Sequence, residues 1–185
     1  SWGGCSGRGF LWTAANGMEE LAVLGNGSNR SSAIAGNGSI LGGFAQGDFS
    51  RTPALWNPDL SGQVLDMAFT GEIYGFSQDG SITLGAINGD GFFETEDDGR
   101  TFIGQLNNGW TGIPEGVSDA GTTIAGFDVL SLAREAWLWR DGIGIKSMNE
   151  VVSSLGLSAP PILVSTAISA DGNVIVGSHS TGAFT

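Results

Sequence analysis

Residues 169–177 read Ser-Ala-Asp-Gly-Asn-Val-Ile-Val-Gly, a tight turn followed by a short apolar strand that ends in glycine. Three earlier stretches of the chain have the same form, at 35–42, 77–85 and 118–126. The turn glycines are 42, 41 and 51 residues apart, at Gly38, Gly80, Gly121 and Gly172. A strand-based repeat of about 40–50 residues is typical of a β-propeller or a related array.

A second motif, an aromatic strand before a turn, recurs in phase with the first, at Phe10–Thr13, Ala54–Asn57, Phe92–Thr95 and Trp137–Arg140. A further strand follows each copy, then a short third strand, the Asn-Gly or Asp-Gly turn and a fourth strand. The sequence therefore predicts an all-β, β-propeller-like array of four four-stranded antiparallel units in a single domain. We expect the units at residues 9–46, 52–90, 91–132 and 135–182.

One short helix is expected near residues 147–157. Its apolar residues have helical spacing, at 148, 151, 152 and 155, and Pro160-Pro161 follows it. This insert accounts for the longest spacing between turn glycines. Both ends of the chain cut through the repeat, which favours a piece of a longer polypeptide or a mature form trimmed at both ends. We also expect Gly182 to Thr185 to form a strand that pairs with Ser1 to Phe10 or with another copy.

The composition limits the function. The chain has 185 residues, 32 of them glycine, and a net charge of −12 with only seven Lys and Arg. Such an acidic chain is repelled by nucleic acids and anionic bilayers, and no stretch is long and apolar enough for membrane insertion. It suits a secreted or cell-surface protein. Cys5 is the only cysteine, which excludes an intrachain disulfide. It pairs with another chain, pairs with a part of this polypeptide outside the given sequence, or is an unremarkable small residue.

The combined pattern resembles the HAF family of bacterial extracellular repeats. Phe10-Leu11-Trp12-Thr13, Gly17-Met18 with Leu24-Gly25, and Ala167 to Gly177 carry the resemblance. Residues 148–157 look like the helical insert in the last unit of such proteins. The resemblance implies secretion, surface display and a β-propeller-like fold, and it brings no catalytic residues. Glu94, which stands where other units have Trp, departs from the pattern.

A calcium site is one candidate, because four oxygen-bearing residues lie close together in the sequence: Asn88, Asp90, Glu94 and Glu96. The stretch does not match an EF-hand loop, and a solvated acidic turn is the other interpretation. The adjoining Thr95–Phe102 fits an Asp box. In that motif an Asp accepts backbone N–H bonds in a turn and the aromatic residue packs inward. No other cofactor is expected.

Three further sets of residues have both a structural and a functional interpretation. The tryptophans at positions 12, 56, 137 and 139 are interpreted as core, against a carbohydrate-stacking platform. We expect Trp12, Trp56 and Trp139 to be buried and Glu94 to be more exposed. Paired carboxylates for glycoside cleavage can be imagined among Glu94, Asp128 and Glu135. His179, the only histidine, is interpreted as a surface residue with no partners for a metal site or a triad.

These observations predict a non-enzymatic extracellular or cell-surface protein that acts as a structural, adhesive or self-assembling scaffold. The expected partners are other copies of itself, surface proteins or glycans. The alternatives are a carbohydrate- or ligand-binding propeller module and, with less support, a polysaccharide-acting hydrolase or lyase.

Overall fold

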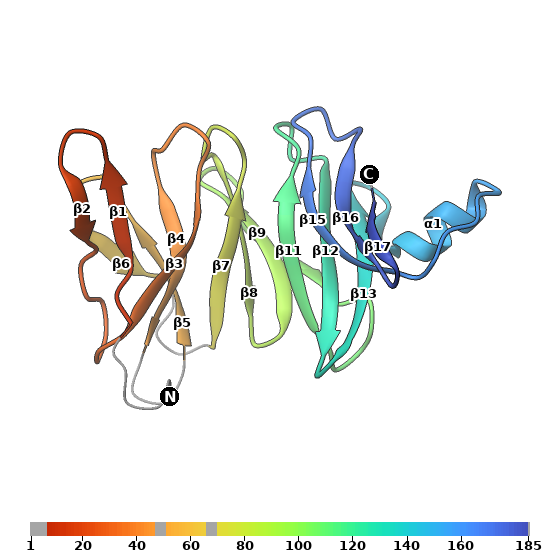
Figure 1. Cartoon of the computed structure of the whole chain (residues 1–185), viewed down its shortest axis with the longest axis horizontal. Coiled ribbons are helices and arrows are strands. Elements are labelled where there is room, and N and C mark those ends of the chain that lie inside the picture. Colours follow the sequence, from red (N-terminus) through yellow and green to blue (C-terminus); the bar gives the residue numbers. More distant parts are fainter. Residues whose placement is uncertain (1–6, 47–50, 66–69, 185) are drawn as a thin grey trace.

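The computed structural model of the chain describes residues 7–46, 51–65 and 70–184. Within these ranges the chain forms seventeen strands and one short helix, and all strand pairs are antiparallel. Figure 1 shows the strands arranged as a row of sheets that follows the order of the chain. No helix in the described part is long and apolar enough to cross a membrane.

Five sheets make up the row. The first sheet has two strands, β1 (Phe10–Thr13) and β2 (Gly17–Glu20). The second has four, β3 (Asn29–Ile34), β4 (Leu41–Gln46), β5 (Arg51–Trp56) and β6 (Gly62–Val64). The third also has four, β7 (Gly71–Phe76), β8 (Ile82–Ile87), β9 (Asp90–Thr95) and β10 (Gly99–Gly104).

The last two sheets continue the row. The fourth sheet consists of β11 (Thr111–Val117), β12 (Thr123–Leu130), β13 (Ala133–Arg140) and β14 (Gly144–Ser147). The fifth has three strands, β15 (Ile162–Ile168), β16 (Ile175–His179) and β17 (Gly182–Phe184). The helix α1 (Met148–Ser154) lies between β14 and β15, where the sequence predicted it.

The sheets are half a unit out of phase with the sequence repeat. Each four-stranded sheet combines the last two strands of one sequence unit with the first two of the next. The second sheet, for example, spans residues 29–64, whereas the sequence units end at 46 and begin again at 52. The aromatic strand therefore pairs with the strand that precedes it. The connections from β8 to β9 and from β12 to β13 are short hairpins.

The turn that carries the repeat is closed by its own polar side chains. The carboxylate of Asp79 accepts hydrogen bonds from the Ser81 backbone N–H at 3.0 Å and from the Ser77 hydroxyl at 2.7 Å. Asp171 makes the matching bonds in the fifth sheet, with Asn173 and Ser169. The glycine that follows each Asp has a positive φ, as the turn requires.

The glycine that closes each repeated motif lies inside its strand, which continues beyond it, and makes room for an aromatic ring. A Cβ atom built at Gly126 would lie 2.6 Å from the ring of Trp137 and 2.2 Å from the Ile113 carbonyl oxygen. Trp137 is the residue paired with Gly126 across the hairpin. The same relation joins Gly85 to Phe92. The two sequence motifs are therefore the two halves of one packing contact.

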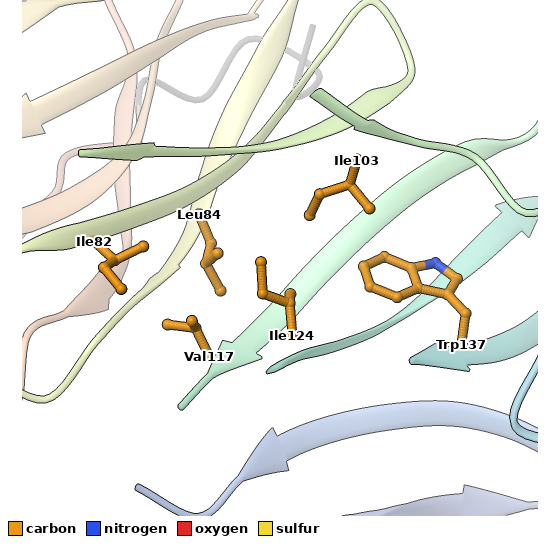
Figure 2. Packing of buried hydrophobic residues seen from close by; sticks show 6 residues of the cluster. All are labelled: Ile82, Leu84, Ile103, Val117, Ile124 and Trp137. Atoms are coloured by element: carbon orange, nitrogen blue, oxygen red, sulfur yellow. The ribbon is translucent and has the colours of Figure 1, made fainter. Parts of the chain in front are cut away.

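The hydrophobic core lies between successive sheets. Figure 2 shows the cluster between the third and fourth sheets, made of Ile82, Leu84, Ile103, Val117, Ile124 and Trp137. Trp139, which is half-buried, packs against Phe93 of the third sheet with ring centroids 5.2 Å apart. The aromatic strand of each sheet thus faces the sheet that precedes it.

The tryptophans show how far this rule extends. Trp56 is completely buried against the first sheet, as expected. The expectation for Trp12 is wrong, since 62% of its surface is exposed. Trp12 lies in β1, and within the described residues no sheet precedes the one that contains it. The burial of the aromatic strand therefore depends on its neighbour and not on the motif itself.

The array is open in the described part of the chain. β1 and β2 lie at one end of the row, and β17 and α1 lie at the other (Figure 1). Gly182 to Phe184 form a strand, as expected, and β17 pairs with β16 in a hairpin. Of the expected N-terminal partner segment, the described residues 7–10 do not pair with β17. Phe184 packs with Ala136 and Ile162 of the last two sheets, which accounts for this pairing. Ser1 to Ser6, which include Cys5, and Thr185 lie outside the described residues.

Candidate functional site

The four candidate calcium ligands do not converge. Asn88 lies in the β8–β9 turn and Asp90 begins β9, whereas Glu94 lies near the other end of that strand and Glu96 follows it. Four strand residues span roughly 13 Å, which separates Asp90 from Glu94. Glu94 is paired with Arg100 at 2.7 Å. Within the described ranges, no group of three or more His, Cys, Asp or Glu side chains is placed to hold a metal.

The Asp-box segment forms the β9–β10 hairpin. Its turn is closed by the Thr95 hydroxyl, which accepts a hydrogen bond from the Asp98 N–H at 3.1 Å. The expected inward aromatic residue, Phe102, is 56% exposed and touches Phe92 only edge-on. His179 is half-buried at the end of β16, where its Nδ1 accepts a bond from the Thr181 N–H.

Of the three imagined carboxylates, two meet. Asp128 and Glu135 are partners in the β12–β13 register, whereas Glu94 belongs to another sheet. The Asp128 carboxylate accepts the Asn107 N–H at 2.7 Å, and Glu135 accepts the Asn107 side-chain amide at 3.0 Å. Glu135 also accepts the Ser147 hydroxyl at 2.7 Å. The pair therefore anchors the loop between β10 and β11.

Asp128 is completely buried, and its Oδ1 has no hydrogen-bond partner among the described residues. Burial raises the pKa of this carboxyl above its ordinary value. The Trp137 indole lies close enough to lower this pKa somewhat, but its Nε1 does not complete a hydrogen bond with the carboxylate. This closed position gives Asp128 a role in holding the loop and leaves no room for a sugar ring.

A different set of polar residues is brought together by β-bulges. The first strands of four sheets, β3, β7, β11 and β15, are neighbours along the row, and we call them the inner strands. Each has a register shift whose inserted residue lies six residues before the turn glycine. These inserted residues are polar: Ser32, Tyr74, Glu115 and Thr166. β15 has a second shift nearer its start, between Ile162 and Val164. A bulge re-aims a side chain out of the ladder, and bulges are common next to functional sites.

The residue two positions before each bulge residue adds charge to two of these strands. Arg30 of β3 and Glu72 of β7 are equivalent positions on neighbouring inner strands, and they form an ion pair at 2.5 Å. The Glu72 carboxylate is almost fully buried, and it also accepts a hydrogen bond from the Ser32 hydroxyl. Arg51 of β5 approaches its second oxygen at 3.7 Å. Two arginines therefore share one buried carboxylate.

Phe44 orients both arginines. Its ring is buried, and the guanidinium groups of Arg30 and Arg51 lie 5.0 and 4.6 Å from its centroid. Cation–π contacts of this kind fix the plane of a guanidinium while leaving its edge available. Both arginine side chains remain almost half exposed. The arrangement is a pre-oriented pair of cations at the surface of an otherwise acidic protein.

Burial shifts the pKa values of two bulge residues. Burial, with the charges of Glu72 and Glu115, raises the pKa of Tyr74 to about 12, so its phenol stays protonated. Burial, together with the Glu72 charge, raises the pKa of Glu115 to about 7. Within the described residues no Arg or Lys forms an ion pair with Glu115. The charges of Glu72 and Glu115 therefore affect the ionisation of side chains on neighbouring inner strands.

Two hollows lie along these strands. The first, of about 390 Å³, is lined by Arg51, Glu72, Tyr74 and the polar residues Thr70, Asn88 and Thr111. The second, of about 250 Å³, is lined by Glu115, Gln78 and apolar residues that include Phe76 and Ile168. Asn88 therefore belongs to the candidate site, although not as a calcium ligand. The sequence reasoning missed the rest of this site.

One sequence signal points to the bulges. The residue after each bulge residue is small: Ala33, Gly75, Gly116 and Ala167. Gly75 lies against the neighbouring inner strand, where an added Cβ would be 2.9 Å from the Glu115 carbonyl oxygen. A polar residue followed by a small one, at a fixed distance before the turn glycine, marks the site in all four copies.

No protein-family model matches the chain, and no curated protein matches it. Solved structures do resemble it. TolB from Acinetobacter baumannii superimposes with a TM-score of 0.57 at 13% identity, over 91% of this chain and 42% of that one. A putative TolB from Agrobacterium tumefaciens gives a TM-score of 0.56 at 14% identity, over 91% of this chain and 68% of that one. The chain thus spans less than half the length of the first structure. At these identities the likeness shows the fold alone, which is all-β and β-propeller-like.

Proposed function

We propose that the protein is a non-enzymatic extracellular or cell-surface scaffold that assembles head to tail through its two end sheets. The observation that carries the proposal is the exposed aromatic face of the first sheet. Trp12 and its register partner Met18 are 62% and 68% exposed, and Phe10 lies on the same face. A face of this kind is typical of a protein-interaction surface.

The contacts inside the row indicate what covers this face. Trp56, at the position equivalent to Trp12, is buried against the sheet that precedes its own. The aromatic strands of the second, third and fourth sheets each have a preceding sheet of this kind. The first sheet therefore presents the same half of an interface that the molecule already uses between its own sheets.

The other half of the interface is exposed at the opposite end. Ile82 of the third sheet is 7% exposed because Val117 and Ile124 of the fourth sheet cover it. Val174, the equivalent residue beside β16, is 52% exposed. A second copy of the chain can supply a neighbour that covers the exposed face of each end sheet. Such a head-to-tail contact forms a chain of copies, or a ring if the rotation closes.

Mixing of two end variants tests the proposal. Trp12→Ser removes the head contact and Val174→Asp removes the tail contact, so each variant should associate about tenfold or more weakly than the wild type. Because each variant keeps one intact half, an equimolar mixture should form a one-to-one dimer that cannot extend. Sedimentation velocity over a wide concentration range measures all four samples, with Leu132→Ser as the control for loss of an exposed apolar side chain.

A wild-type chain that stays monomeric at every concentration would overturn the proposal. Association that is unchanged in both end variants would also overturn it, by placing the contact elsewhere. A monomer that is retained on a glycan array would support the carbohydrate- or ligand-binding alternative. The extracellular location is supported by the acidic, lysine-poor composition, and the presence of the protein in culture supernatant or on intact cells tests it.

A further inference from the structure

The hollow beside Arg51 combines one charged anchor with neutral polar walls. Its volume of about 390 Å³ is in the range of small-molecule sites, about 300–1,000 Å³. Thr70 lies directly before β7, and Thr111 begins β11. The Gly112 N–H donates to the Gly89 carbonyl at 2.8 Å, which ties β11 to the β8–β9 turn that carries Asn88. The walls are therefore held by backbone hydrogen bonds.

Arg51 is the charged anchor because Glu72, the carboxylate that it approaches, is already neutralised by Arg30. Glu72 is paired with Arg30 at 2.5 Å and bonded to Ser32, whereas Arg51 approaches it only at 3.7 Å. Among the described residues, the other contact of Arg51 is with the face of the Phe44 ring. Stacking on a ring leaves the planar edge of a guanidinium free to bind a carboxylate through two parallel hydrogen bonds.

The charge of the site selects a ligand with one negative charge. Arg30 and Arg51 carry two positive charges and the Glu72 carboxylate one negative charge, which leaves a surplus of one. Glu115 faces the same groups from β11, and its raised pKa keeps it mostly neutral below pH 7. A dianion such as sulfate would be opposed by Glu72. The hydroxyl and amide groups of Thr70, Thr111 and Asn88 fit ligand hydroxyls, and the Tyr74 ring offers an apolar face.

We propose that this hollow binds a hydroxylated monocarboxylate, for which a hexuronate such as glucuronate is the probe, with the ligand carboxylate on Arg51. The site is separate from the end sheets, so it does not depend on self-assembly. Its ligand is the carboxylate-bearing unit of an acidic sugar or a free sugar acid. A polymer with many charges would be disfavoured by the net charge of −12.

Titration calorimetry and amide NMR shifts at pH 6 test the site with four probes. Glucuronate should bind more tightly than acetate, which lacks the hydroxyls, and more tightly than glucose, which lacks the carboxylate. Sulfate, a dianion at pH 6, should bind more weakly than glucuronate. The shifted amides should include those of Thr70, Asn88 and Thr111. Equal binding of glucose and glucuronate, or tighter binding of sulfate, would overturn the proposal, as would the absence of saturable binding.

Three variants locate the ligand. Arg51→Gln should lower the affinity for glucuronate about tenfold or more, since a charge-assisted bidentate contact is lost. The matched control is Arg134→Gln, because Arg134 also lies over a ring, that of Phe127, in a different sheet. Thr111→Val should weaken glucuronate binding and leave acetate binding unchanged. An Arg51→Gln chain that melts like the wild type and binds glucuronate equally well would refute the assignment.

Discussion

Trp12 and Trp56 occupy the same position in two copies of one sequence motif, and their surroundings are opposite. Trp56 has no exposed surface, whereas most of Trp12 is exposed. The strands that carry them are equivalent, and each is followed by a short partner strand. The difference is the preceding sheet, which only Trp56 has among the described residues. Features of this molecule therefore divide into those set by the local sequence and those set by a neighbouring sheet.

The largest expected effect separates the two tryptophans directly. Trp56→Ala should lower the free energy of unfolding by about 3–5 kcal/mol, because it leaves a large cavity between the first two sheets. Trp12→Ala should change it by at most about 0.5 kcal/mol in the monomer, as for other exposed positions. Urea unfolding at low protein concentration measures both. Equal losses for the two variants would break the comparison.

A smaller effect concerns Glu115, whose pKa depends on the neighbouring inner strand. Its pKa is raised from 4.5 to about 7, so between these values the folded chain keeps a proton that the unfolded chain has released. The stability contributed by this group is therefore fully present below pH 4.5 and is lost as the pH rises to 7. Glu115→Gln should be more stable than the wild type by about 1–2 kcal/mol at pH 8, after allowance for partial exposure.

At pH 4 the same substitution should leave the stability nearly unchanged. Thermal unfolding at the two pH values measures the difference. Glu20→Gln is the control from the first sheet, because Glu20 is exposed on β2 and its one ion pair among the described residues is with Arg8. A gain for Glu115→Gln that is the same at pH 4 and pH 8 would show that packing, and not ionisation, is its cause.

The smallest expected effect is that of the turn aspartates on stability, and it should be the same in the third sheet and in the fifth. Hydrogen bonds from the turn lower the pKa values of Asp79 and Asp171 to about 2, from 3.8. Their contribution to stability is present above pH 3.8 and is lost as the pH falls through 2. Carboxyl-carbon NMR titration should give the two residues the same midpoint. A normal pKa for Asp171 alone would show that even the turn needs a neighbouring sheet.

The features that the sequence predicted are the local ones. The Asp-Gly turns, the aromatic strands and the helix near 147–157 follow from residue chemistry within a few positions, and all are present. The phase of the sheets is not local, since it depends on which of two connections closes a hairpin. The exposure of Trp12 and of Phe102 also depends on distant residues. The pattern of one strand cannot show whether another sheet covers it.

The candidate site shows the same division. The calcium hypothesis counted oxygen atoms along the sequence, but an extended strand carries Asp90 and Glu94 apart. The inner-strand cluster depends on bulges, which shift alternate side chains to new directions without changing the composition. Arg30 and Glu72 are 42 residues apart in the sequence, and only the stacking of equivalent strands brings them together.

The half-unit offset between repeats and sheets affects how the chain can be divided or extended. A cut at a sequence-unit boundary, such as that near residue 91, separates β8 from β9 and breaks a hydrogen-bonded ladder. A cut in the loop between β10 and β11 leaves every ladder intact. Conversely, duplication of one unit adds half a sheet at each junction and recreates whole sheets on both sides. Gene duplication could therefore lengthen such a chain without requiring a new kind of contact between sheets. A shortened variant for engineering should end at residue 104.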